Sequence, residues 1–185
     1  MNSTRVARID GVRISEIQSA SDRRGLFLKF HPKSEITNSL DSVALSFNPN
    51  SGTLRGLHFQ VEPFAEEKLV TCIQGSIFDV IVDLRPSSKT FGKWTSFELN
   101  EDNFLQVYLP KGIAHGFQTL SPNTIVHYCL SSRYDAGSSF AIDPFGELNV
   151  SWPIETDYVS ERDKRGLTFA NAADKYSQSI GFIKL

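Results

Sequence analysis

The sequence predicts an all-β fold that closes into a barrel or a two-sheet jelly roll. Between residues 43 and 131, short runs rich in Val, Ile, Phe and Leu are divided by Gly, Pro, Asn or Ser, a rhythm typical of strands and turns. Within SIFDVIVDL (76–84), Ile77, Asp79 and Ile81 share one face and Phe78 and Val80 the other. Closure removes exposed strand edges, and a cavity between the sheets is then the natural place for a site.

The expected elements follow from the same rhythm. Strands are predicted at 43–47, 68–73, 76–84, 94–99, 105–110 and 124–130, with turns at 48–53, 74–76, 85–90, 110–112 and 121–123. Residues 156–185 are more polar and are predicted to form short helical turns in a tail that folds back over the barrel. A chain of 185 residues fits one domain, 1–185.

The composition narrows the classes of partner. With 40% hydrophobic and 22% charged residues, the chain reads as an ordinary globular protein. A net charge of −2 without a basic stripe argues against a nucleic-acid partner and favours a small molecule. No signal peptide or membrane-length apolar stretch is seen, so no membrane association and a cytoplasmic location are expected. Cys72 and Cys129 lie in separate apolar runs and are expected to be buried thiols.

Polar groups gather in a few strand-like strings. These are DRRG (22–25), TLRGLHFQ (53–60), EEKLV (66–70), IFDVIVDLR (77–85), PKGIAHGF (110–117) and IVHYCLSSRY (125–134). Buried polar groups are costly unless they are paired, so a set that converges inside one barrel indicates a functional site.

These strings resemble the dTDP-4-dehydrorhamnose 3,5-epimerase family from about Asp22 to Asp163. The most specific pieces are RGLHFQ, KLV, GxIxDVxVDLR, TFGKW, PxGxAHGF and the late SWP followed by SxRD. The resemblance implies a cupin-like jelly roll (double-stranded β-helix) that forms a homodimer by N-terminal strand exchange. It also implies an epimerase acting beside the keto group of a nucleotide-linked 4-keto-6-deoxyhexose, in the synthesis of deoxysugars for surface polysaccharide.

Epimerisation beside a ketone needs a base, a positive charge near the keto oxygen, and an acid on the opposite face. An imidazole titrates near neutral pH, and the resemblance makes His58 the base. It places Asp163 beside the other ring nitrogen, although the sequence alone would also allow a solvated loop charge. Lys68 would stabilise the enolate, with a surface lysine as the alternative, and Tyr128 would be the acid.

The resemblance also implies a set of substrate-binding residues. His115 and Asp79 would support the sugar and the proton network, Tyr134 would lie near the nucleotide, and Arg55 and Arg24 would contact the diphosphate and nucleotide. Arginine suits this role because its rigid fork donates two hydrogen bonds at once. Gln60 of RGLHFQ and Arg162 of SxRD complete the set drawn from the family strings.

A metal or cofactor is not expected. The cupin class often binds a metal through two histidines separated by one residue, whereas His58 is followed by Phe59 and Gln60. No GxGxxG indicates a nicotinamide cofactor, and the keto group already supplies the activation that a redox step would create.

Departures from the family pattern bear on the substrate. Lys29 stands where the family usually has a glutamate that would accept the N3 proton of thymine. Because lysine only donates, a CDP-linked sugar is suggested, or a dTDP-linked one if Lys29 faces solvent. Ser138 and Ser139 replace a sugar-contacting glutamate, and Ser46 and Asn48 are the nearest polar groups where a Gln-x-Asn pair is usual.

These changes favour inversion of C3, with C5 as a second centre in doubt. Two other functions remain open at this stage. One is a sugar-nucleotide 3,4-ketoisomerase on the same class of barrel, and the other is a non-catalytic sugar-binding cupin. The presence of the base, its carboxylate, the lysine and the tyrosine together favours the epimerase.

Overall fold

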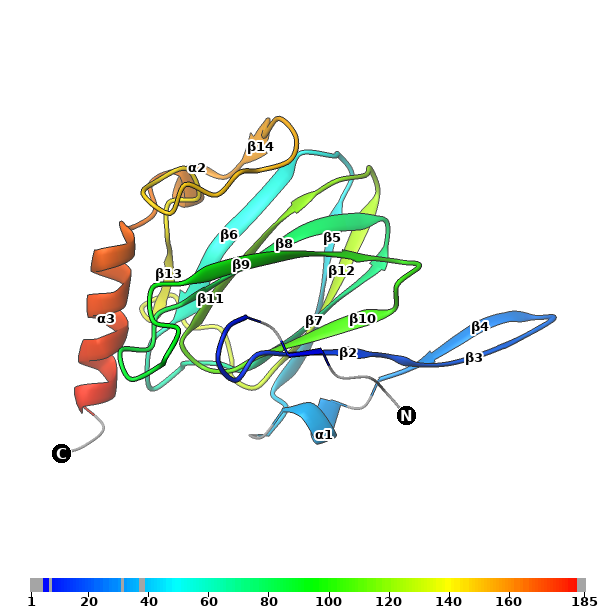
Figure 1. Cartoon of the computed structure of the whole chain (residues 1–185), viewed down its shortest axis with the longest axis horizontal. Coiled ribbons are helices and arrows are strands. Elements are labelled where there is room, and N and C mark those ends of the chain that lie inside the picture. The colour runs from blue at the N-terminus through cyan, green and yellow to red at the C-terminus, as the bar shows by residue number, and fades with distance from the viewer. Residues whose placement is uncertain (1–4, 7, 31, 37–38, 183–185) are drawn as a thin grey trace.

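The core of the molecule is two facing β-sheets that form a jelly roll (Figure 1). The computed structural model describes residues 5–6, 8–30, 32–36 and 39–182. The first sheet has the order β1 (Arg5–Val6), β2 (Arg13–Glu16), β10 (Leu105–Leu109), β7 (Lys68–Gln74), β12 (Thr124–Leu130) and β5 (Ser42–Asn48). The second has the order β13 (Ser139–Ala141), β6 (Thr53–Gln60), β11 (Ile113–Thr119), β8 (Ser76–Asp83) and β9 (Trp94–Asn100).

The alternation in SIFDVIVDL separates two buried layers. Ile77 and Ile81 point into the space between the sheets and join the inner core. Val80 and Val82 point outward and join an outer core. Asp79 therefore faces the interior of the barrel, and it is completely buried. Every strand expected from residues 43 to 131 is confirmed, and RGLHFQ and AHGF form β6 and β11.

The C-terminal segment covers the outer face of the second sheet, as expected, but as a longer helix than the predicted short turns. After β14 (Tyr158–Val159), which pairs in parallel with β6, the chain forms α2 (Glu161–Lys164) and then α3 (Phe169–Phe182). Ala172 and Tyr176, one helical turn apart, pack on Val80 and Val82 in the outer core. This burial stabilises a continuous helix.

A hairpin of β3 (Gln18–Asp22) and β4 (Gly25–Lys29) extends away from the barrel, at the end opposite α3 (Figure 1). The short helix α1 (Pro32–Glu35) follows it and leads into β5. Unlike the second sheet, the first sheet has no helix of that length on its outer face among the described residues. Its edge strand β5 presents Val43, Leu45 and Phe47 at 58%, 48% and 63% exposure. The two outer faces are thus covered unequally.

Candidate active site

A β-bulge in β6 brings two site residues into the barrel. Opposite β11, His115 pairs with His58 and Phe117 pairs with Arg55, so two steps along β11 correspond to three along β6. Paired residues point to the same side of a sheet, and an extra residue shifts the alternation of the strand. Arg55 and His58 therefore both face the interior, although they are three residues apart.

Glycine is required at this bulge. Gly56 has φ 121°, a backbone conformation that residues with a side chain rarely adopt. A Cβ on Gly56 would lie 2.5 Å from the Cα of Gly116 on the neighbouring strand. The glycines of RGLH and AHGF thus allow β6 and β11 to approach closely beside Arg55 and His58.

A cavity of about 250 Å³ lies between the sheets and is lined by three of the four predicted catalytic residues, His58, Lys68 and Tyr128. It is lined from the first sheet by Ala44, Ser46, Lys68, Tyr128 and Leu130, and from the second by Arg55, His58, His115 and Phe117. His58 and Tyr128 thus lie on opposite walls. A base and an acid placed in this way could act on opposite faces of one ring.

The first histidine pair connects the cavity to α2. His58 Nε2 lies 2.7 Å from Asp163 Oδ1, and the backbone N–H of Gly56 donates to Asp163 Oδ2. Ser160 caps α2 and accepts from the Asp163 N–H, which fixes the carboxylate in place. Burial opposes the charged form, but the hydrogen bonds from His58 and Gly56 outweigh it and lower the pKa of Asp163. As a carboxylate, Asp163 accepts a hydrogen bond from the Nε2–H of His58, which leaves the lone pair of a neutral ring on Nδ1.

The second histidine pair is deeper. His115 Nε2 lies 2.7 Å from Asp79 Oδ1, and the Tyr128 ring meets His115 edge-on with centroids 6.1 Å apart. Burial raises the pKa of Asp79, an effect that His115 only partly offsets. Asp79 Oδ2 is buried without a hydrogen-bond partner among the described residues. Burial also raises the pKa of Tyr128, so the phenol keeps its proton at neutral pH.

Lys68 begins β7 and points into the cavity. Its side chain is 9% exposed, and Nζ lies 3.2 Å from Glu66 Oε1 and 3.5 Å from the His58 carbonyl oxygen. The ammonium is therefore held inside the barrel and is not a solvated surface charge. A cation at this place could stabilise an oxyanion that forms between His58 and Tyr128.

Arg55 connects this cavity to a second one. Its Nε donates to Asn48 Oδ1 at 2.8 Å, and Ser46 Oγ donates to the same oxygen. The second cavity, of about 350 Å³, is lined by Thr53, Leu54, Arg55, His58, Tyr158, Ser160, Arg162 and Asp163. Asn48 is thus a support for Arg55 and does not itself line either cavity.

Tyr134 and Arg162 lie at the rim of the second cavity. Arg162 lines it, donates to the Tyr134 hydroxyl at 3.4 Å, and is anchored on Ser139 at 2.9 Å. Tyr134 is 65% exposed. An exposed cation therefore lines the same cavity as Arg55 and contacts an exposed aromatic ring at its rim, an arrangement that suits a nucleotide.

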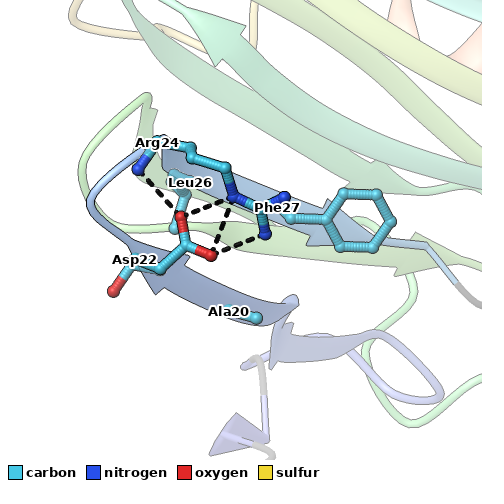
Figure 2. A pocket seen from close by; sticks show the side chains of 7 residues that line it. Ala20, Asp22, Arg24, Leu26 and Phe27 are labelled. Carbon is cyan, nitrogen blue, oxygen red and sulfur yellow. Dashed lines mark hydrogen bonds and ion pairs between the residues drawn. The ribbon is translucent and has the colours of Figure 1, made fainter.

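Six predicted binding residues line neither cavity. Asn48, Asp79 and Tyr134 each form a hydrogen bond with a residue that does, whereas the other three lie elsewhere. Gln60 is buried, and its amide forms hydrogen bonds with the backbone of Phe64, Arg133 and Asp135. Arg24 and Lys29 lie on the extended hairpin. Figure 2 shows the Arg24 guanidinium against the Asp22 carboxylate, 2.6 Å away at the closest contact.

Some lining residues were not predicted. Ala44, Phe117 and Leu130 are apolar, so they carried no chemical signal of their own. Strand alternation would have found them, because they lie two residues from Ser46, His115 and Tyr128. Glu66, in the predicted EEKLV string, was likewise missed, although it lies two residues before Lys68.

The described residues contain neither a cluster of metal-binding side chains nor a membrane-spanning helix. Across 5–6, 8–30, 32–36 and 39–182, His, Cys, Asp and Glu side chains form no group of three suited to a metal ion. None of the helices in those ranges has the length and apolar character needed to cross a membrane. Cys72 and Cys129 are free and buried, as expected.

Comparisons with known proteins agree with the fold and identify the family. A dTDP-4-dehydrorhamnose 3,5-epimerase of Sinorhizobium fredii is 39% identical over 161 residues, which cover 82% of each chain. A dTDP-4-dehydrorhamnose 3-epimerase of Streptomyces niveus is 34% identical and covers 90% of this chain and 83% of its own. The crystal structure of the Bacillus anthracis 3,5-epimerase with TDP and PPi bound superposes with a TM-score of 0.85 and 34% identity, covering 91% of this chain and 99% of that one.

These relatives give no support to the CDP-linked substrate suggested by Lys29, because they are named for dTDP-linked sugars. They give none to a ketoisomerase or a non-catalytic cupin either. The family model described as dTDP-4-dehydrorhamnose 3,5-epimerase matches residues 6–171. The chain therefore belongs to the dTDP-4-dehydrorhamnose 3,5-epimerase family and is a nucleotide-sugar epimerase of jelly-roll fold.

Proposed function

We propose that this chain inverts C3 of a dTDP-linked 4-keto-6-deoxyhexose by removing a proton from one face of the sugar and returning one to the other. The observation that carries the proposal is the position of His58 and Tyr128 on opposite walls of one cavity. A hydrogen beside a ketone is acidic because the charge left by its removal moves onto the keto oxygen. Lys68 lies in the same cavity, where its ammonium can take up that charge.

The proton path assigns a role to each pair. His58 removes the C3 proton while Asp163 stabilises the imidazolium that forms. The enolate oxygen is held by Lys68. Tyr128 then donates its proton to C3 from the opposite face, and His115 with Asp79 supports the phenol from behind.

The nucleotide belongs in the second cavity. Arg55 lies between the two cavities, so a sugar beside His58 would leave its diphosphate at the guanidinium. Arg162 and Tyr134 are then available to the nucleotide. The dTDP-linked form is supported by the names of the relatives and by the TDP bound in the Bacillus anthracis structure.

Deuterium exchange tests this function directly. The chain is incubated in heavy water with a dTDP-linked 4-keto-6-deoxyglucose, and incorporation at C3 and C5 is followed by NMR. Incorporation at C3 is expected, with a product of inverted configuration, and the H58A variant is expected to lose about a thousandfold in rate. Exchange by H58A at the wild-type rate would reject the mechanism. Deuterium at C5 as well would extend the activity to both carbons. Faster turnover of the CDP-linked sugar than of the dTDP-linked one would contradict the dTDP-linked substrate proposed here.

We also propose that the chain functions as a homodimer in which the hairpin of one copy lies on the other. Support comes from two apolar surfaces on the same chain. Leu26 and Phe27 are 47% and 67% exposed on the hairpin, and Leu45 and Phe47 are exposed on the outer face of β5. Such a contact would bring Arg24 and Lys29 to a partner's site. Sedimentation of the wild type and of an F47D variant tests this, since the variant should sediment as a monomer.

A further inference from the structure

The buried ion pair between Glu66 and Lys68 is not accounted for by the proton path above. Lys68 is the first residue of β7, and Glu66 lies two positions earlier, in the loop that leads from β6 into this strand. Glu66 Oε1 lies 3.2 Å from Lys68 Nζ, and the side chains are 10% and 9% exposed. Glu66 does not line the cavity, whereas Lys68 does.

This pair differs from the other lysine pairs in its surroundings. Lys111 pairs with Glu62 at 3.0 Å with its side chain 36% exposed, and Lys164 pairs with Glu161 at 2.9 Å with its side chain 46% exposed. Exposed pairs of this kind contribute little because water and salt screen them. A buried pair is hardly screened, so loss of one partner strongly affects the other.

A lysine ammonium needs such a restraint to act as a precise donor. Its four-carbon stem has many rotamers, and the ammonium carries three hydrogens. Glu66 Oε1 forms an ion pair with Nζ at 3.2 Å, and Nζ donates to the His58 carbonyl oxygen at 3.5 Å. These two contacts restrict where the ammonium can lie, and Lys68 lines the cavity, so its remaining hydrogens are available to a ligand there.

We propose that Glu66 is a positioning residue for Lys68 and sets the place where the ammonium meets the keto oxygen of the substrate. This inference rests on the function proposed above and adds a residue that it does not use. The role is to hold the ammonium, not to supply charge. By charge alone the carboxylate would weaken the attraction between Lys68 and an enolate, since it adds a negative group nearby.

Two substitutions separate position from charge. E66Q keeps an oxygen that can accept from Nζ, whereas E66A removes it. The rate of deuterium exchange at C3 is expected to fall about tenfold in E66A, as when a reacting group is slightly misplaced, with kcat and not KM affected. E66Q is expected to stay within about twofold of the wild type, and dTDP is expected to bind both variants as it binds the wild type.

A matched control and a double variant complete the experiment. E62A removes a glutamate of the same loop whose partner is Lys111, and it should leave the exchange rate unchanged. In a Lys68→Met background, Glu66→Ala should cause no further loss, because the residue acts only through the lysine. Should E66A not fold, as judged by circular dichroism, E66D withdraws the carboxylate by one methylene and is expected to change the rate in the same direction.

The outcomes are distinct. If E66A exchanges deuterium at the wild-type rate, this inference alone is overturned. The same holds if Glu66→Ala lowers the exchange rate of the Lys68→Met variant as much as it lowers that of the wild type. An E66Q variant as slow as E66A would show that the charge is what matters and would also overturn the positioning role. A wild-type chain that exchanged no deuterium at C3 would overturn the proposed function, and this inference with it.

Discussion

The protein contains two histidine–carboxylate pairs with the same N···O distance, 2.7 Å, in opposite surroundings. His58 is 38% exposed and stands where the two cavities meet, and its partner Asp163 receives a second hydrogen bond from a backbone N–H. His115 is 4% exposed, and Asp79 leaves one oxygen without a partner among the described residues.

The difference shows that distance does not decide the role of a histidine pair. Hydrogen bonding lowers the pKa of Asp163 despite its burial, so this carboxylate stays charged and can stabilise an imidazolium. Burial raises the pKa of Asp79, so the deeper pair carries charge reluctantly. The first pair therefore suits proton removal, and the second suits support of a neutral phenol.

The largest expected effect comes from Asp163→Asn in the exposed pair. The amide can present its NH₂ group to Nε2, which would move the ring proton to Nδ1 and block the base. Deuterium exchange at C3 should fall about a thousandfold. The matching change in the deep pair, Asp79→Asn, should cost far less. Equal losses in the two variants would erase the distinction between the pairs.

Tyr128→Phe should have the next largest effect and should act on one half of the reaction. Removal of the phenol should lower formation of the inverted product about a hundredfold, while His58 still exchanges the C3 proton with retention of configuration. NMR of the recovered sugar in heavy water distinguishes the two. Tyr176→Phe, which removes a phenol of the outer core, is the control. Parallel loss of exchange and inversion would contradict the separation of base and acid.

The smallest effect concerns stability and should have opposite pH dependence in the two pairs. The folded pKa of Asp163 is lowered, so its stabilisation is present above the unfolded pKa of about 4 and is lost as the pH falls through the folded value. The folded pKa of Asp79 is raised, so its contribution is present below about 4 and is lost as the pH rises through the folded value.

The free energy of urea unfolding, measured from acid to neutral pH, tests this. Asp163→Asn should cost about 2 kcal/mol at neutral pH, and the deficit should shrink below about pH 4. Asp79→Asn should instead become more stable relative to the wild type as the pH rises. Curves of the same slope for both variants would show that the two carboxylates do not differ in environment.

Sequence reasoning reached the parts of the molecule that local pattern determines. Alternation predicted the central strands, since one-sided burial gives a period of two, and the RGLH and AHGF strings predicted the residues of one cavity wall. Asp163 was found only through the family resemblance, because it lies 105 residues from His58 and nothing local relates them.

Other features depend on tertiary structure and could not be predicted. The α3 helix forms because the outer face of the second sheet buries its apolar residues, which a polar-looking tail did not indicate. Gln60 looked like a site residue because of its neighbours in RGLHFQ, but the loops after β6 and β12 use its amide. The direction of the hairpin that carries Arg24 and Lys29 likewise could not be predicted from the residues of the hairpin.

Because of the bulge in β6, Arg55 and His58 face the same side of the sheet although they are three residues apart. With plain alternation over the three residues from Arg55 to His58, the two side chains would lie on opposite sides of the sheet, and the Arg55 guanidinium would point out of the barrel while His58 stayed in place. Phosphate recognition and proton removal would then be uncoupled although both residues were still present. The extra residue is therefore what allows one strand to present both groups to the same ligand.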